Sequence, residues 1–161
     1  MDVPLLPREG IGPFRLGASL DETQSIAEDI EGARVERVTA SRGGEIRLLV
    51  RLPLFEYTIA STRGDVVSSV AVSRFIDETA DVHVLLGETD VFRTPSDDLD
   101  EILRARYTVT EEFAFEVQEL AMIFANHSSH EYPEDEEGFP LYYDYVLVGD
   151  GEHPAFRAGR P

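Results

Sequence analysis

Metal-ligating residue types gather at one place in the sequence, the motif His127-Ser-Ser-His130. Carboxylates follow it at Glu131, Glu134 and Asp135. Two imidazoles three residues apart could hold zinc together with one of these carboxylates. The two serines and the nearby Pro133 instead favour a polar loop, in which no element fixes the ligand geometry. We expect the polar loop and neither a metal nor another cofactor, although whether the His127/His130 loop binds a metal stays open.

The run Glu134-Asp135-Glu136-Glu137 offers oxygen ligands of the kind that Ca²⁺ prefers. It lacks the EF-hand pattern, which favours a solvated acidic loop. Nucleophile signatures are missing as well, since the chain has no Cys, no Gly-x-Ser-x-Gly and no phosphate loop of the Walker type. A general acid–base pair made of distant carboxylates leaves no mark in a sequence. We expect a non-catalytic protein and keep an enzyme as an alternative.

Negative charge is concentrated in the second half of the chain. Residues 1–75 hold 11 acids and 9 arginines, whereas residues 76–161 hold 21 acids and 5 arginines, and Lys is absent. Twelve of those acids lie between Arg106 and Arg157, with no basic residue among them. A field of one sign repels nucleic acid, attracts basic proteins and accelerates the encounter with them. The charge therefore predicts a basic protein partner and no direct nucleic-acid binding.

The bulk composition bounds the class of protein. At 161 residues, 42% of them hydrophobic, the chain is long enough for one domain with its own core. The absence of cysteine excludes disulfides and thiolate catalysis. The first four residues lack the basic and apolar regions of a signal peptide, and no apolar run approaches the roughly 20 residues that cross a bilayer. We expect a single domain over 1–161 in the cytoplasm, with no membrane partner.

The first half is expected to contain one helix followed by an antiparallel meander. Ser19 and Glu22 have the spacing of a capping box, which predicts a helix over 19–30. Apolar residues then indicate four strands, separated in two places by turns at 42–44 and 62–65. The predicted strands are 33–40, 46–51, 55–59 and 66–75. The alternation predicts one apolar sheet face.

The second half is expected to start with another helix. Ser96 is placed as the N-cap of a helix that runs to about Arg106. The residues predicted on its buried side are Leu99, Ile102 and Leu103.

Beyond that helix the periodicity is ambiguous. Residues 111–124 match both a helix and two strands, and the likeness between the two halves favours the strands. Residues 132–138 are predicted as a polar loop, and 141–148 alternate as a strand does. The segment 151–161, rich in Gly, Pro and Arg, is expected as a flexible tail.

The two halves carry a weak internal likeness. Phe92-Arg93 repeats Phe14-Arg15, and Leu99-Asp100-Glu101 repeats Leu20-Asp21-Glu22. Two degenerate repeats over 10–76 and 81–150 would explain the matches. Chance and common helix-capping chemistry would also explain them, so both interpretations stay open. The predicted fold class is α+β, an antiparallel meander sheet with one or two helices per half.

The segment Phe14–Glu22, Phe-Arg-Leu-Gly-Ala-Ser-Leu-Asp-Glu, resembles the helix entry of small bacterial β-lactamase-inhibitor-protein-like domains. The second copy is similar to the tandem arrangement of those domains. The resemblance implies a protein that binds and blocks another protein across a sheet face. As an acidic chain without catalytic motifs, the protein is also similar in character to bacterial immunity proteins, which neutralise a cognate toxin in the cytoplasm.

We therefore expect a non-catalytic inhibitor or immunity protein, whose acidic surface in residues 107–152 blocks a basic partner such as a toxin. Aromatic side chains anchor interfaces, while charges at the rim mainly govern the association rate. The predicted partner-binding residues are Glu131, Tyr132, Glu134, Asp135, Glu136, Glu137, Tyr142 and Tyr143. One alternative is a nucleic-acid mimic that occupies a DNA- or RNA-binding protein; it needs rows of acids, which 111–119 would supply only as a helix. The other is a small-ligand protein or enzyme that uses the sheet face.

Overall fold

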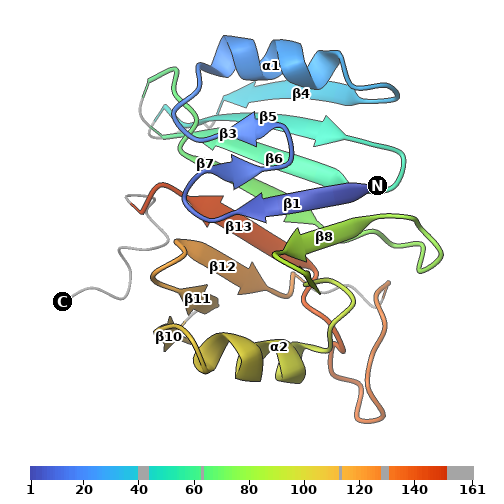
Figure 1. The fold of residues 1–161 in the computed structure, drawn as a ribbon. Helices are drawn as coiled ribbons and strands as arrows, with labels where there is room; N and C mark the ends of the chain where they lie inside the picture. The colour runs from blue at the N-terminus through green and yellow to red at the C-terminus, as the bar shows by residue number, and fades with distance from the viewer. Residues whose placement is uncertain (40–43, 63, 113, 128–130, 152–161) are drawn as a thin grey trace.

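Two β-sheets and two helices make up the protein in the computed structural model shown in Figure 1. The structure describes residues 1–39, 44–62, 64–112, 114–127 and 131–151. The predicted turn at 42–44 and the predicted tail at 151–161 fall almost wholly outside these residues. The helices and the largely antiparallel sheets confirm the α+β class. Within the described residues, neither helix is long and apolar enough to span a membrane.

The larger sheet has eight strands in the order β10-β11-β12-β13-β7-β6-β5-β4, each antiparallel to its neighbours. They are β4 (Arg34–Thr39), β5 (Ile46–Arg51), β6 (Glu56–Ser61), β7 (Ser69–Ser73), β10 (Val109–Thr110), β11 (Phe115–Val117), β12 (Met122–Ala125) and β13 (Tyr145–Gly149). Alternation explains the strands: Leu48 and Val50 of β5 are buried, whereas Arg47 and Arg51 are exposed. The last strands of the two halves, β7 and β13, pair at the centre of the sheet.

The smaller sheet lies in front of the middle of the larger one in Figure 1. Its order is β3-β2-β1-β8-β9. The bounds are β1 (Asp2–Leu6), β2 (Gly10–Ile11), β3 (Phe14–Arg15), β8 (His83–Leu86) and β9 (Thr89–Asp90). Strand β1 lies between the hairpins β2–β3 and β8–β9, and it runs parallel to β8 with Val3 opposite Val84. No sequence pattern predicts this sheet, because three of its strands have only two residues each.

Helix α1 (Leu20–Glu28) begins where the capping box predicts. The Ser19 hydroxyl oxygen accepts a hydrogen bond from the Glu22 N–H at 3.1 Å, and this bond satisfies one of the unpaired donors of the first turn. Leu20 and Ala27 are buried, so the helix packs on the sheet through the face that carries them, whereas Ile26 is 42% exposed.

Helix α2 (Ser96–Arg104) differs from its prediction in two respects. Its N-cap is Pro95, and the Ser96 hydroxyl donates to the carbonyl of Leu141 at 3.3 Å instead of capping the helix. Ile102 was expected to be buried, and that is wrong: it is 43% exposed, whereas Leu99 and Leu103 are buried. A long-range contact with Leu141 has therefore replaced the local capping bond.

Strand boundaries also differ from the predicted ones. Residues 111–124 contain β11 and β12, which confirms strands over a helix. Strand β13 begins at Tyr145 rather than at residue 141, because the preceding residues pack against α2. In the first half, β7 begins at Ser69, three residues later than predicted.

One hydrophobic core lies between the larger sheet and the layer made by the smaller sheet and both helices. Val3, Leu20 and Leu99 come from the three parts of that layer and cluster with Ile59 and Phe124 of the larger sheet. Each fully buried side chain of this kind stabilises the fold by about 1.5–3 kcal/mol. On the opposite face, the described residues form only a small apolar cluster: Ala71, Ala121, Ile123 and Leu147. The described helices and smaller sheet thus cover one face of the larger sheet.

Candidate functional site

The connection between β12 and β13 contains an ordered hairpin at residues 133–141, which we call the acidic hairpin. Glu134 and Pro140 form an isolated antiparallel bridge. The Leu141 N–H donates to the Pro133 carbonyl at 3.0 Å, and the Asp135 N–H donates to the Phe139 carbonyl at 2.8 Å. Residues 132–138, predicted as a polar loop, therefore have a defined conformation in this part of the chain.

Asp135 holds the turn of the acidic hairpin together. Its Oδ1 accepts hydrogen bonds from the backbone N–H groups of Glu137 and Phe139, both at 2.9 Å. Gly138 completes the turn with φ of 87°, a left-handed conformation that Gly adopts without strain, and its N–H donates to the Asp135 carbonyl at 3.1 Å. The Asp135 carboxylate is thus engaged in shaping the hairpin.

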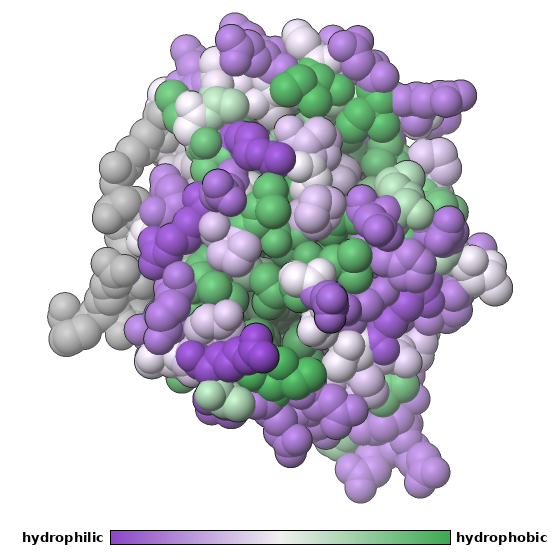
Figure 2. Space-filling model, viewed as in Figure 1, coloured by the Kyte–Doolittle hydropathy of each residue, from purple (hydrophilic) through white to green (hydrophobic). Residues whose placement is uncertain are grey.

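Glu136 and Glu137 project into solvent from this turn. Both are exposed, and no ion pair joins either carboxylate to another described residue. Glu134 is exposed beside them. Figure 2 shows hydrophilic residues projecting at the lower right, where the β12–β13 connection protrudes in Figure 1. The charges of Glu136 and Glu137 attract cationic groups at this end of the molecule.

Phe139 is a candidate binding residue that the sequence analysis missed. Its side chain is 62% exposed, the largest exposure among the large hydrophobic residues described. It lies between Gly138 and Pro140, and an aromatic residue inside a short polar turn was the signal that could have identified it. An aromatic ring held in solvent beside carboxylates is typical of a protein-binding surface.

The first turn of α2 adds negative charge beside the acidic hairpin. The Ser96 N–H donates to the Leu141 carbonyl at 2.9 Å, so the start of α2 lies against the base of the hairpin. Asp97 and Asp98 follow and are exposed. They stabilise the positive end of the helix dipole and also extend the acidic surface.

The three predicted tyrosine anchors have different environments. Tyr132 is half-buried, its hydroxyl donates to the Arg74 carbonyl at 3.2 Å, and burial raises its pKa. The Tyr142 ring lies 4.7 Å from the Arg74 guanidinium carbon. Tyr143 is only 8% exposed, and its hydroxyl donates to the Asp100 carboxylate at 2.6 Å. Tyr143 is thus part of the core packing, and we leave it out of the binding surface.

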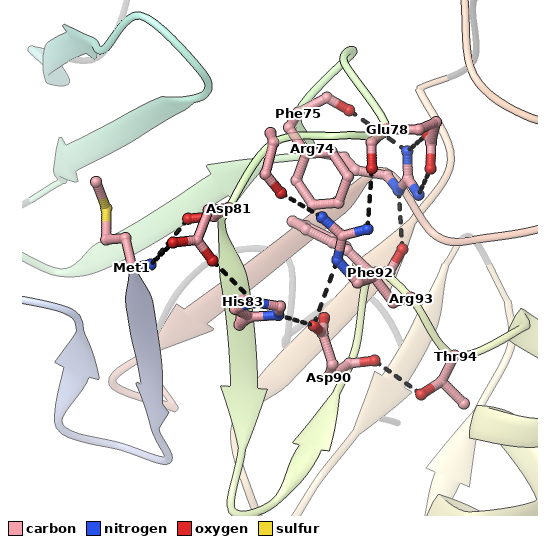
Figure 3. A network of polar contacts seen from close by, with 11 residues as sticks. Met1, Arg74, Phe75, Glu78, Asp81, His83, Asp90, Phe92, Arg93 and Thr94 are labelled. Atoms are coloured by element: carbon pink, nitrogen blue, oxygen red, sulfur yellow. Dashed lines mark hydrogen bonds and ion pairs between the residues drawn. The ribbon is translucent and has the colours of Figure 1, made fainter.

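Arg74 fixes the neighbouring end of the larger sheet. Its Nε donates to the Phe92 carbonyl at 2.9 Å, and its guanidinium forms a two-point ion pair with the Glu78 carboxylate, as Figure 3 shows. This hydrogen-bonded pair lowers the pKa of Glu78. The guanidinium carbons of Arg74 and Arg93 each lie 4.4 Å from the Phe75 ring centroid. A fully buried cation with this many partners makes the segment that follows β7 rigid.

Three other acids within residues 107–152 have partners inside the fold and stabilise local structure. Glu111 pairs with Arg104 at 2.8 Å. Glu119 accepts hydrogen bonds from the Thr108 N–H, which lower its pKa. Asp144 is 3% exposed and accepts the His127 N–H at 2.8 Å. Near the acidic hairpin, by contrast, Glu136 and Glu137 are exposed side by side.

The histidines do not form a recognisable reactive centre in the described chain. Residues 128–130, including His130 of the predicted metal motif, lie outside the described residues. The His127 ring packs on Tyr145 with centroids 4.3 Å apart, and no metal-binding group of His, Asp or Glu exists among the described residues. Both ring nitrogens of His83 contact carboxylates, Nδ1 that of Asp90 at 2.9 Å and Nε2 that of Asp81 at 3.2 Å (Figure 3).

A histidine that acts as a general base needs one ring nitrogen directed at the substrate or nucleophile. His83 has both nitrogens engaged, so its geometry is that of a structural link between β8 and β9. The acidic hairpin is therefore the candidate site that the described residues offer. No family model, curated protein or solved structure matches this chain.

Proposed function

We propose that this protein is a non-catalytic inhibitor or immunity protein that blocks a basic protein partner, such as a toxin. The observation that carries the proposal is the acidic hairpin, which holds the Phe139 ring and the carboxylates of Glu136 and Glu137 in solvent. The partner would offer an apolar pocket rimmed by Arg or Lys. Blocking would be steric, and the acidic surface would accelerate the encounter.

The internal order of the acidic hairpin supports this function. Asp135 fixes the turn before any partner arrives, so little conformational entropy is lost on binding. The Phe139 ring is mostly exposed, so it contributes little to the core of its own chain. Burying the ring in a partner would add hydrophobic free energy to binding. The predicted residues Glu131 and Glu134 would contribute at the rim, together with Tyr132 and Tyr142.

We also infer that the two halves are degenerate copies of one unit. Each half has a short hairpin, then a helix and then four strands, and β7 and β13, the last strand of each, pair antiparallel. The sequence likeness matches Leu99 of α2 to Leu20 of α1. Leu20 is the first residue of α1, whereas α2 begins at Ser96, three residues before Leu99. Such a tandem arrangement supports the resemblance to β-lactamase-inhibitor-protein-like domains.

Mimicry of nucleic acid has less support. That function would need acids in a regular row, which residues 111–119 would provide as a helix. The described residues of this segment instead contain strand β11 and the turn that follows it, and Glu111 and Glu119 are engaged with Arg104 and Thr108.

A second candidate function is small-ligand binding on the uncovered face of the larger sheet. A hollow of about 280 Å³ lies there, over the small side chains of Ala60, Ser69 and Ala71 and beside Tyr145. Its volume lies just below the range of ligand pockets, which runs from about 300 to 1,000 Å³. Saturable binding of a metabolite that is lost in Ala71→Phe would favour this candidate.

The proposed function is tested by placing a photo-crosslinking phenylalanine analogue at position 139 and exposing the protein to the proteome of its source. A basic protein should be captured, and the same analogue at Val66, which is 46% exposed elsewhere, serves as the matched control. The rate of association with the captured protein should fall as salt rises from about 50 to 500 mM, because ions screen steering.

Two outcomes would contradict the proposal. One is an association rate that does not depend on salt. The other is an unchanged affinity in the triple variant Glu136→Gln, Glu137→Gln, Phe139→Ser, which removes charge and ring but keeps Asp135 and therefore the turn.

A further inference from the structure

A groove separate from the acidic hairpin lies at one end of the larger sheet. It has a volume of about 460 Å³ and is formed by the β5–β6 connection, the segment after β7, and Tyr132. For comparison, a cavity of about 150 Å³ holds a benzene molecule. The groove is thus large enough for a bulky side chain.

The walls of the groove are apolar and partly exposed. Leu54 is 39% exposed and Ile76 is 58% exposed, whereas Phe55, at 6%, is buried beneath them. Two exposed aliphatic side chains that face one groove, beside the Tyr132 ring, leave apolar surface in water that an apolar guest would cover.

The groove exists before any guest binds, because its walls are fixed from within. The buried Arg74 network holds the segment that leads to Ile76, and the Tyr132 hydroxyl is bound to the Arg74 carbonyl. On the opposite wall, the Leu52 N–H donates to the Phe55 carbonyl at 2.9 Å and closes the β5–β6 turn. A preformed groove loses little entropy when it is filled.

The charged side chains that line the groove are Arg51, Arg74, Glu56 and Asp77, and two further acids, Glu36 and Glu78, pair with those arginines. Arg51 lies between Glu36 and Glu56 at 3.5 and 3.6 Å, so two carboxylates share one exposed cation. Arg74 is matched by Glu78. Asp77 is fully exposed, and the Thr79 side chain and N–H bond its carboxylate, lower its pKa and keep it ionised.

We propose that the groove receives an apolar side chain of the partner that is flanked by Arg or Lys. The apolar group would lie against Leu54, Ile76 and Tyr132, and the flanking cations would meet Glu56 and Asp77. This proposal rests on the proposed function, since Tyr132 directly precedes the acidic hairpin and makes the groove a second contact site for the same basic partner.

The test uses three blocked pentapeptides and the ¹⁵N-labelled protein in NMR titrations at low salt. The peptides are Gly-Arg-Leu-Arg-Gly, Gly-Arg-Ala-Arg-Gly and Gly-Gln-Leu-Gln-Gly, which separate the apolar group from the charge. The first should shift the amide signals of Leu54, Ile76 and Tyr132 saturably. Each of the other two should bind at least fivefold more weakly.

Variants locate the binding. Ile76→Asn should weaken the first peptide at least fivefold, and because Ile76 is exposed the substitution leaves the core intact. Val66→Asn, a similar change at an exposed residue away from the groove, should have no effect. Equal binding of the leucine and alanine peptides, or an unchanged affinity in Ile76→Asn, would overturn the proposal.

Two further measurements separate this proposal from the proposed function. The triple variant of the acidic hairpin should no longer bind the partner but should still bind the first peptide. If binding of the partner is lost in the triple variant and is unchanged in Ile76→Asn, the groove proposal fails and the proposed function stands. If sedimentation shows a dimer that Ile76→Asn dissociates, the occupant is a second copy of this chain, which also overturns the proposal.

Discussion

The Arg74 network and the acidic hairpin use charge in opposite ways. In the network, a buried guanidinium meets the Glu78 carboxylate, the Phe92 carbonyl and three aromatic rings. In the hairpin, Asp135 is engaged by its own turn, while Glu136 and Glu137 point to solvent. Charge matched inside the fold contributes to stability, whereas unmatched charge at the surface contributes to recognition. Substitutions should therefore affect stability in the first region and binding in the second.

The largest effect on stability is expected from Arg74→Met. It removes a fully buried cation and leaves the Glu78 carboxylate and the Phe92 carbonyl without their donor, so the free energy of unfolding should fall by about 2–4 kcal/mol. Denaturant titration measures this change. Arg51→Met, which removes an exposed arginine, is the matched control and should cost less than about 1 kcal/mol. An equal fall in the free energy of unfolding in both variants would show that the buried arginine stabilises the fold no more than the exposed one.

Asp135→Ala should have an intermediate and local effect. The variant deprives the Glu137 and Phe139 N–H groups of their acceptor, which costs about 1 kcal/mol at the hairpin. Hydrogen exchange at these two amides should accelerate several-fold, while the amides of β7 should exchange as before. Glu136→Ala changes a neighbouring carboxylate that does not bond these two amides, and it should leave both rates unaltered. Unchanged exchange in Asp135→Ala would show that the backbone alone holds the turn.

A smaller effect concerns the acid stability of the network. The Arg74 hydrogen bond lowers the folded-state pKa of Glu78, so the ionised carboxylate stabilises the fold above its ordinary pKa of 4.5. This stabilisation should be lost as the pH falls through the lowered pKa. The unfolding free energy of Glu78→Gln should lie below that of the unaltered protein at pH 7, and the gap should close in acid. A gap that stays constant with pH would assign the effect to packing.

The smallest effect on stability is expected from Phe139→Ser. Because the ring is mostly exposed, the unfolding free energy should change by less than about 0.5 kcal/mol. Binding to the partner should nevertheless weaken at least tenfold, by loss of an anchor worth about 2 kcal/mol. Calorimetry on the variant and on the complex measures both quantities. A large loss of stability would mean that the ring belongs to the fold and not to the binding surface.

Local signals in the sequence predicted local structure well. The spacing of Ser19 and Glu22 was sufficient to place the start of α1, because the capping bond joins neighbours in the chain. The same reasoning misplaced Ser96, because its hydroxyl bonds to Leu141, 45 residues later. A contact of that range depends on the fold and has no pattern along the chain.

Only part of the candidate site was predicted from the sequence, because the rest depends on contacts between distant segments. The run 134–137 indicated a polar acidic loop, and the structure adds that Asp135 shapes it. The exposure of Phe139 and the burial of Arg74 oppose the usual preferences of these residue types, and both depend on which segments meet in space. Tyr143 was expected in the interface and lies in the core, because Asp100 of α2 accepts its hydroxyl.

The position of β1 has a consequence for how the chain folds during synthesis. This strand pairs in parallel with β8, so its Val3 must wait until Val84 has left the ribosome before the smaller sheet can close. Likewise β7 has only β6 beside it until β13 is made. Pairings of such long sequence separation slow folding. A nascent first half would expose its strand edges for much of translation, and its productive folding would depend on the second half arriving before another chain pairs with those edges.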